Sequence, residues 1–254
     1  MRTKVCSVFA LLIMLSMSLS VFAQVQEDSL VGWWRFDTMA DETGNWGDIA
    51  LHGATLVEGQ LVVETGKWAH ALDYTGPEIT ELTLASWLSL DNYARTNGSA
   101  LTLDKVTVDQ FCGIIWAERV DRQWMPGSSH FRRTDDFPRA VTETDSGDLH
   151  FIAITYKNVS NQYEITGYRN GESMGSFTKG DLRTWPAGDA EAVWGKRHTN
   201  GLTGPGDLNA HIEESRIYNV ALTADEIETL QIEGLTLVEP QGKLATQWGA
   251  LKFK

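Results

Sequence analysis

Apolar and polar residues alternate with a period of two along most of this chain, and this alternation most limits what it can fold into. In the stretch ELTLASWLSL, four leucines fall on one face and the intervening residues on the other: Leu82, Leu84, Leu88 and Leu90 against Thr83, Ala85, Trp87 and Ser89. The stretches LHFIAITY and QYEITGYRN behave in the same way. Because successive side chains of a β-strand point to opposite faces of a sheet, the alternation predicts β-strands.

The dipeptide Asn170-Gly171 lies between two of these predicted strands. Both residue types tolerate the positive φ that the central positions of a tight hairpin turn require, so we expect a β-hairpin there. Clusters of turn residues recur at short intervals along the rest of the chain. The fold class is therefore predicted to be all-β, a two-sheet antiparallel β-sandwich.

One segment, LTADEIETLQ, has a convincing helical pattern. Thr223 can accept a hydrogen bond from the first turn, and Glu226 can return one to the backbone N–H of Thr223. Ile227 and Leu230 supply one apolar face. We expect a short C-terminal helix that lies across one sheet edge.

Residues 1–23 have the pattern of a secretory signal peptide. Arg2 and Lys4 precede an apolar stretch, VFALLIMLSMSLSVF, and Val21 and Ala23 occupy the small-residue positions before a cleavage site. An uncleaved anchor is the alternative, although a membrane span needs about 20 apolar residues. We expect a domain over 24–234, a tail over 235–254, and a location outside the cytoplasm: secreted, periplasmic or on the cell surface.

The chain is acidic, with 21 basic against 34 acidic residues and a formal net charge of −13. Loss of Arg2 and Lys4 with the signal peptide leaves 19 basic residues against the same 34 acidic ones, a charge of −15. This charge argues against nucleic acid and anionic membrane surfaces as partners. Cys112 would be the one cysteine left, so no intrachain disulfide can form. No motif with a histidine accompanies Cys112, which favours a buried apolar role over a nucleophilic one.

Seven blocks follow one another in a familiar order: LVGWWRFD, DETGNWGDIALHGATL, GKWAHALDYTG, LTLASWLSL, LHFIAITY, YRNGESMGS and HIEESRIYNVALTADEIETL. Together they resemble the laminin-G-like, concanavalin A-type jelly-roll domains over about residues 30–232. The last block is the most specific, since it is similar to the family's closing motif Ile-Asp-Glu-x-Arg-Ile-Tyr-Asn. The resemblance implies a jelly roll of two sheets packed face to face, with glycan or protein ligands bound by loops or by the concave sheet.

The resemblance also implies a calcium site. In this family the loop after the first strand lies near the closing motif, and several members bind one Ca²⁺ there. The candidate ligands are four side chains of RFDTMADETGNWGD and one of the closing block: Asp37, Asp41, Asn45, Asp48 and Glu213. Calcium takes six to eight oxygen ligands, which such a loop could supply. Glu213 replaces the family's Asp, which could weaken the site, and the alternative is a turn without a metal.

The sequence contains no motif that supplies the catalytic residues of a polysaccharide hydrolase or lyase. A retaining glycosidase requires two carboxylates about 5–5.5 Å apart. Glu118 and Asp121 are three residues apart and Glu213 and Glu214 are adjacent, so on a strand each pair would point to opposite faces. The lyases of this architecture are matched only by the fragment YRNGES. We therefore expect no catalytic residues.

The region FCGIIWAERVDRQWMPGSSHFRRTDDFPRA is the predicted ligand-binding region. Its candidate residues combine aromatic rings with basic side chains: Trp116, Arg119, Arg122, Trp124, His130, Arg132 and Arg133. Sugars stack an apolar face on aromatic rings and bond their hydroxyls to polar side chains. The arginines could favour uronic or sulfated sugars. The alternative is that Trp116 belongs to the core and that the arginines are solvated or paired with neighbouring acids.

Three functions remain open from sequence. The one we favour is a secreted, non-catalytic module that binds carbohydrate, with a structural Ca²⁺ as a possible cofactor. A protein-adhesion module and a polysaccharide hydrolase or lyase are the alternatives. We expect the mature chain to be a monomer. The segment 235–254, with its basic end, could be an added edge strand, a flexible tail or a surface-docking signal.

Overall fold

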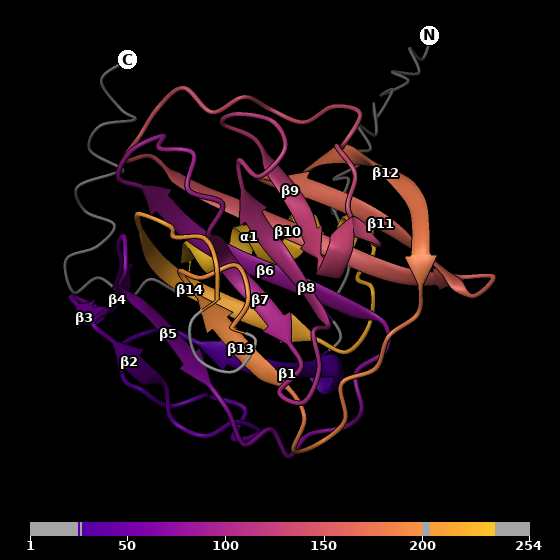
Figure 1. The fold of residues 1–254 in the computed structure, drawn as a ribbon, viewed down its shortest axis with the longest axis horizontal. Coiled ribbons are helices and arrows are strands. Elements are labelled where there is room, and N and C mark those ends of the chain that lie inside the picture. Colours follow the sequence, from indigo (N-terminus) through magenta and orange to yellow (C-terminus); the bar gives the residue numbers. More distant parts are fainter. Residues whose placement is uncertain (1–24, 26, 200–203, 237–254) are drawn as a thin grey trace, which may run out of the picture.

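The computed structural model describes residues 25, 27–199 and 204–236, which form two antiparallel sheets packed face to face and one α-helix (Figure 1). The prediction of a signal peptide falls outside the described residues, as do residues 237–254 of the predicted tail. The predicted fold class, an all-β antiparallel sandwich with one C-terminal helix, is confirmed. No helix among the described residues is long and apolar enough to cross a membrane.

The larger sheet has the strand order β12-β11-β10-β6-β14-β4-β3, and β1 also pairs with β14. Its strands are β1 (Leu30–Trp34), β3 (Thr55–Val57), β4 (Gln60–Val63), β6 (Leu82–Leu90), β10 (Leu149–Val159), β11 (Gln162–Arg169), β12 (Glu172–Asp181) and β14 (Ala210–Tyr218). The smaller sheet has the order β2-β5-β13-β7-β8-β9. Its strands are β2 (Ala50–His52), β5 (Trp68–Ala71), β7 (Ser99–Asp104), β8 (Phe111–Trp116), β9 (Trp124–Ser128) and β13 (Glu191–Trp194). Two 3₁₀ turns, η1 (Glu27–Ser29) and η2 (Ser129–Phe131), and the helix α1 (Ala224–Thr236) complete the fold.

The main core lies between the two sheets. The four leucines of β6 all belong to this core, as the alternation predicts: Leu82, Leu84, Leu88 and Leu90. They share it with Cys112 and Ile114 of the opposite sheet. Burial at this central layer supplies the hydrophobic stabilisation of a fold whose described cysteine, Cys112, is free.

The helix α1 covers the outer face of the larger sheet, where a second apolar cluster forms. Ile227 and Leu230 pack there against Trp87 and Phe151. The expectation that the helix lies across a sheet edge is therefore wrong. The large aromatic residues on the second face of β6 and β10 need a cover, and α1 supplies it.

The predicted local signals of the helix and the hairpin are confirmed. Thr223 Oγ1 accepts a hydrogen bond from the N–H of Glu226 at 3.3 Å, and the Glu226 carboxylate accepts one from the N–H of Thr223 at 2.8 Å. Asn170 and Gly171 form the turn between β11 and β12 with φ of 50° and 81°. Both positions are left-handed, as a type I′ turn requires.

The closing strand β14 pairs with three other strands of the larger sheet, more than any other strand of that sheet. It pairs with β6 along one side, and with β4 and β1 along the other. On its outer face, the guanidinium of Arg216 lies 4.9 Å from the ring centroid of Trp33 and 5.3 Å from that of Trp87. Its Nε donates to Glu214 at 2.5 Å. Arg216 thus joins the first strand, the central strand and the closing strand.

Replacement of Arg216 by Ala is expected to lower the free energy of unfolding by about 3–5 kcal/mol, because it leaves the buried Glu214 carboxylate without its cation. The replacement Lys157→Ala, at an exposed position of β10, is the control and is expected to change it by less than about 0.5 kcal/mol. Urea unfolding measures both. A loss below about 1 kcal/mol for Arg216→Ala would contradict the role assigned to this side chain.

Candidate functional site

A strained, exposed ridge follows β9. It is the 3₁₀ turn η2, in which His130 and Phe131 have φ of 53° and 55°. Left-handed backbone costs a residue other than glycine about 1–2 kcal/mol, and such strain gathers at functional sites. The Phe131 side chain is 47% exposed, which is unusual for a phenyl ring.

Hydrogen bonds to two serines hold the ridge in place. The Ser128 hydroxyl accepts the N–H of Arg133 at 2.8 Å and bonds the Thr134 hydroxyl at 2.9 Å. The Ser129 hydroxyl accepts the N–H of Phe111 at 3.1 Å. These bonds tie the ridge to the start of β8, so the strained conformation is fixed by the sheet beneath it.

Two pockets flank the ridge and share Asp109, Ser129 and His130. The first, which we call the basic pocket, has a volume of about 220 Å³ and is also lined by Val108, Gln110, Arg132, Arg133 and Arg183. The second, the mixed pocket, has a volume of about 270 Å³ and is also lined by Phe111, Glu118, Ser128, Phe131, Arg197 and His198. Together they give the ridge a concave surface on each side.

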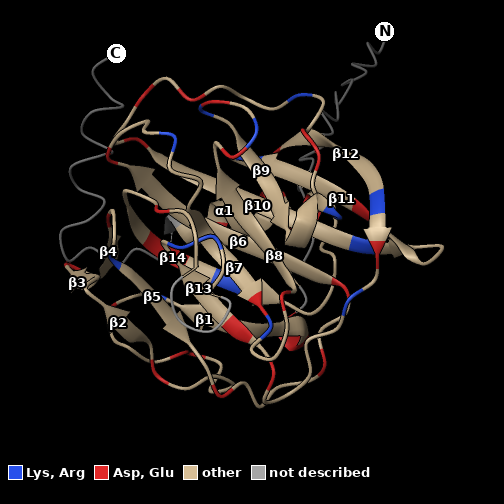
Figure 2. Cartoon of the chain, in the orientation of Figure 1, with Lys and Arg blue, Asp and Glu red and all other residues tan. Residues whose placement is uncertain are grey.

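The basic pocket is built around a buried arginine. Arg133 is 1% exposed, and its Nη2 donates to the carbonyl of Phe111 at 3.2 Å. Its Nη1 lies 3.7 Å from Asp181 Oδ1, and the other oxygen of Asp181 forms an ion pair with Arg183 Nη2 at 2.6 Å. In Figure 2, basic and acidic segments alternate accordingly at the end of β12 and on the loop that follows. A single carboxylate therefore serves two guanidinium groups.

The mixed pocket holds an ion pair and an aromatic stack. Arg197 Nη1 donates to the carboxylate of Glu118, which is largely buried. Burial raises the pKa of Glu118, while Arg197 acts in the opposite direction. The rings of Phe111 and His198 stack with centroids 4.5 Å apart. This pocket presents both hydrogen-bonding groups and apolar ring surface.

The predicted ligand-binding residues separate into three groups. His130, Arg132 and Arg133 line the pockets. Trp116 and Trp124 are each 1% exposed and pack against one another in the core with centroids 4.9 Å apart. Their burial corrects the expectation that these rings face a ligand, because the inward positions of β8 and β9 point into the sandwich.

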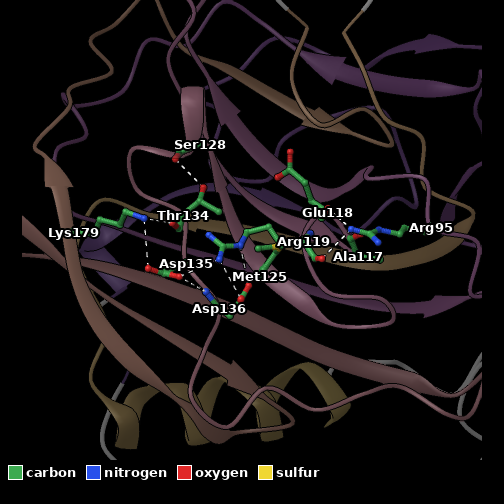
Figure 3. Close-up of polar contacts among 10 residues, drawn as sticks. All are labelled: Arg95, Ala117, Glu118, Arg119, Met125, Ser128, Thr134, Asp135, Asp136 and Lys179. Atoms are coloured by element: carbon green, nitrogen blue, oxygen red, sulfur yellow. Dashed lines mark hydrogen bonds and ion pairs between the residues drawn. The ribbon is translucent and has the colours of Figure 1, made fainter.

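The other two predicted residues are paired with neighbouring acids. Arg119 contacts Asp135 at 3.5 Å and Asp136 at 3.2 Å, as Figure 3 shows. Arg122 pairs with Asp121 at 3.6 Å and lies over the ring of Tyr93. Glu118 and Asp121 follow β8 in a loop, so the expectation that they alternate along a strand does not hold. Neither Arg119 nor Arg122 lines either pocket.

Sequence reasoning missed several lining residues that come from distant segments. Arg183 follows β12, Arg197 and His198 follow β13, and Gln110 precedes β8. None of them belongs to a recognisable motif. Only the packing of strand ends brings them to η2, so no local pattern could have identified them.

The carboxylate of Asp41 holds the acidic loop after β1 together by accepting hydrogen bonds from it. Asp41 accepts hydrogen bonds from the backbone N–H groups of Trp33 at 2.7 Å, Asn45 at 2.9 Å and Trp46 at 3.2 Å. It also accepts the hydroxyl of Thr43 at 2.5 Å. Hydrogen bonds of this kind are typical of a turn in which an Asp carboxylate accepts from the backbone N–H groups around it.

The other predicted calcium ligands take separate partners. Asp37 pairs with Arg35 at 3.6 Å, Asp48 is exposed, and the amide nitrogen of Asn45 donates to the carbonyl of Val31 at 3.2 Å. Within the described residues, no three His, Cys, Asp or Glu side chains are grouped as a metal site. The binding of calcium by this loop stays a prediction.

A β-bulge at Glu213 changes the orientation of the closing motif. The register of β14 against β6 shifts between Ile212 and Glu214, which adds one residue. Glu213 then accepts from Gln60 of β4, and Glu214 accepts from Trp33 Nε1 at 2.7 Å. The bulge puts both carboxylates on the outer face, so the expectation that they diverge to opposite faces is wrong. The carboxylate that contacts the first strand belongs to Glu214.

Two carboxylates lie opposite one another on neighbouring strands of the smaller sheet. A motif within one strand could not indicate this pair. Asp104 of β7 is directly opposite Glu191 of β13. Glu191 contacts His70 Nδ1 at 2.5 Å and accepts the hydroxyl of Thr199 at 2.6 Å, and Asp104 accepts the N–H of Thr199 at 2.9 Å. Both carboxylates are buried, and neither lines the two pockets described above.

The sandwich, its closing motif and the loop pockets define a lectin-type jelly roll. The model of the Laminin_G_3 family, described as the concanavalin A-like lectin/glucanases superfamily, matches residues 71–228. The chain belongs to this family, as the resemblance of its sequence blocks implies. No curated protein matches it.

Solved structures share the fold at low sequence identity. Domain 4 of AbnA, an extracellular GH43 arabinanase from Geobacillus stearothermophilus in complex with arabinotriose, is 17% identical with a TM-score of 0.58, and the match covers 80% of this chain and 98% of that domain. The Trypanosoma rangeli sialidase in complex with sialic acid is also 17% identical, with a TM-score of 0.56. That match covers 83% of this chain and 34% of the sialidase. At these identities the likeness shows the fold.

Replacement of Asp41 by Ala is expected to lower the free energy of unfolding by about 2–4 kcal/mol, because several N–H groups lose their charged acceptor. The exposed Asp48→Ala is the matched control, with an expected change below about 0.5 kcal/mol. Thermal and urea unfolding with excess Ca²⁺ and with EDTA measure both variants.

The Asp41→Ala loss is expected to be the same under both conditions, since N–H groups surround this carboxylate. Wild-type protein that becomes as unstable as Asp41→Ala in EDTA, and recovers with Ca²⁺, would contradict this account and support a calcium site.

Proposed function

We propose that this chain is a secreted, non-catalytic module that binds carbohydrate at the η2 ridge. The observation that carries the proposal is the exposed Phe131 ring on a strained turn that lines two polar pockets, one of which Phe131 itself lines. A sugar presents apolar C–H faces and a set of hydroxyls, so an aromatic ring beside fixed donors and acceptors suits it.

The relatives and the sequence support this proposal. AbnA domain 4 was solved with arabinotriose, and the Trypanosoma rangeli sialidase with sialic acid. The signal-peptide pattern of residues 1–23 is consistent with a module that meets polysaccharides outside the cell. A strained conformation at an exposed site is consistent with ligand binding, because strained backbone conformations are frequent at functional sites.

The proposal includes a preference for anionic polysaccharides. Arg132, Arg133 and Arg183 line one pocket in a chain whose formal net charge is −13. Within that pocket, Asp109 is the one carboxylate among the lining residues. Guanidinium groups bind carboxylates and sulfates through two parallel hydrogen bonds, so this pocket suits an acidic sugar better than the rest of the surface does.

A polysaccharide hydrolase is the second candidate, and the cross-strand pair Asp104–Glu191 is the observation that favours it. Retaining enzymes need two carboxylates about 5–5.5 Å apart, and opposite residues on paired strands lie at similar separations. The burial of both residues and their hydrogen bonds to Thr199 favour a structural role. Release of reducing sugar by wild type, lost in Glu191→Gln, would establish the enzyme instead.

The proposed function is tested on a glycan array probed with the mature chain and with Phe131→Ala. We expect saturable binding by wild type and a loss of affinity of about tenfold or more in the variant, because the ring surface for stacking is removed. Val141→Ala is the control, since Val141 is a similarly exposed apolar residue that lines neither pocket.

Equal binding by wild type and Phe131→Ala would contradict the assignment of the site. Binding of extracellular proteins without binding of any glycan would contradict the proposed function and support the adhesion alternative. A parallel array in EDTA reports whether a divalent cation takes part.

A further inference from the structure

The guanidinium of Arg133 is buried and makes few hydrogen bonds inside the protein. Neither Nε nor Nη1 has a hydrogen-bond partner among the described residues. Burial raises the pKa of the nearby Cys112 thiol and of the Tyr156 hydroxyl, so both groups are neutral at neutral pH. Among the residues that the structure describes, the one carboxylate paired with Arg133 within 4 Å is that of Asp181. A buried guanidinium with so few partners is costly unless an anion joins it.

Asp181 is an incomplete partner for this charge. Its Oδ1 lies 3.7 Å from Arg133 Nη1, which is too far for a hydrogen bond, whereas its Oδ2 forms an ion pair with Arg183 Nη2 at 2.6 Å. Its side chain is 56% exposed, so it can rotate into solvent without uncovering the core. An exposed ion pair of this kind contributes little to stability, and a competing anion can replace it.

The backbone holds this arrangement in place. Gly180 has φ of +77°, and a Cβ at that position would lie 2.5 Å from Cγ of Arg133. The end of β12 therefore packs directly against the stem of Arg133. This contact fixes the position of the backbone from which the side chain of Asp181 extends. The guanidinium of Arg133 is thus positioned by the fold before any ligand binds.

We propose that Asp181 holds the place of a ligand carboxylate, and that a uronic-acid sugar displaces it from Arg183 and Arg133 in the basic pocket. The inference rests on the proposed function and names the class of sugar that this pocket takes. The ligand's carboxylate accepts from Arg183 and lies over Arg133, as Asp181 does in the free protein. Arg132 and Gln110 line the same pocket and can donate to the sugar hydroxyls.

The competing carboxylate sets the selectivity of the pocket. A neutral sugar has no anionic group that can replace the carboxylate of Asp181. The Asp181–Arg183 ion pair therefore stays intact, and the neutral sugar gains no contact with Arg183. Asp109 also lines the pocket, but it lies 3.3 Å from His130 Nε2 and can pair with that ring. A uronic-acid sugar carries one carboxylate, which can take the place of the Asp181 carboxylate beside both guanidinium groups.

The test measures binding of oligogalacturonate by calorimetry for wild type, Asp181→Asn and Arg183→Gln. We expect Asp181→Asn to bind about tenfold more tightly, because the internal competitor is gone, and Arg183→Gln to bind at least about tenfold more weakly. Asp48→Asn is the control: it makes the same change in net charge at an exposed residue that lines neither pocket, and we expect no tightening.

The outcomes separate this inference from the proposed function. Weaker or unchanged binding by Asp181→Asn, or equal tightening by Asp48→Asn, would overturn the inference. Unchanged binding by Arg183→Gln would overturn it independently, even if Asp181→Asn failed to fold. Wild-type protein that binds neutral oligosaccharides but no uronate would overturn the inference and leave the proposed function standing, whereas binding of no glycan would overturn both.

Discussion

The pairing of β14 with three other strands is the interaction on which the rest of the structure depends. It closes the larger sheet by joining β6 to β4 and β1, which come from distant parts of the chain. Arg216, held between the rings of Trp33 and Trp87, fixes the outer face of that junction. No disulfide is described in this fold, so strand pairing and the buried core maintain the positions of the loops.

The rigid sandwich makes the ridge and the basic pocket possible. Two consecutive left-handed residues in η2 and the buried charge of Arg133 each cost free energy. The surrounding core offsets both costs, and the serines at the end of β9 hold the turn in one conformation. Strain and an incompletely paired charge at one exposed place are the properties that we expect of a binding site, because a bound ligand would compensate for part of both.

Much of the fold could be predicted from local sequence, whereas most of the site could not. The alternation of β6, the Asn170-Gly171 turn and the Thr223–Glu226 cap depend on neighbouring residues alone, and all three are confirmed. The position of α1 and the bulge at Glu213 depend on which strands pair and which faces remain open. In the site, His130, Arg132 and Arg133 are contiguous with a recognisable region, but Arg183 and Arg197 reach it only through the ends of β12 and β13.

The most direct test of the central claim is a residue-resolved map of binding by NMR, in which the labelled mature chain is titrated with the glycan that it binds most tightly. The account predicts saturable shifts in the amides of Ser129–Arg133 and in Arg183, with little change in the loop 35–48 or across α1. Shifts confined to the loop 35–48, to the face that carries Asp104 and Glu191, or to α1 would contradict the assignment of the site to the η2 ridge.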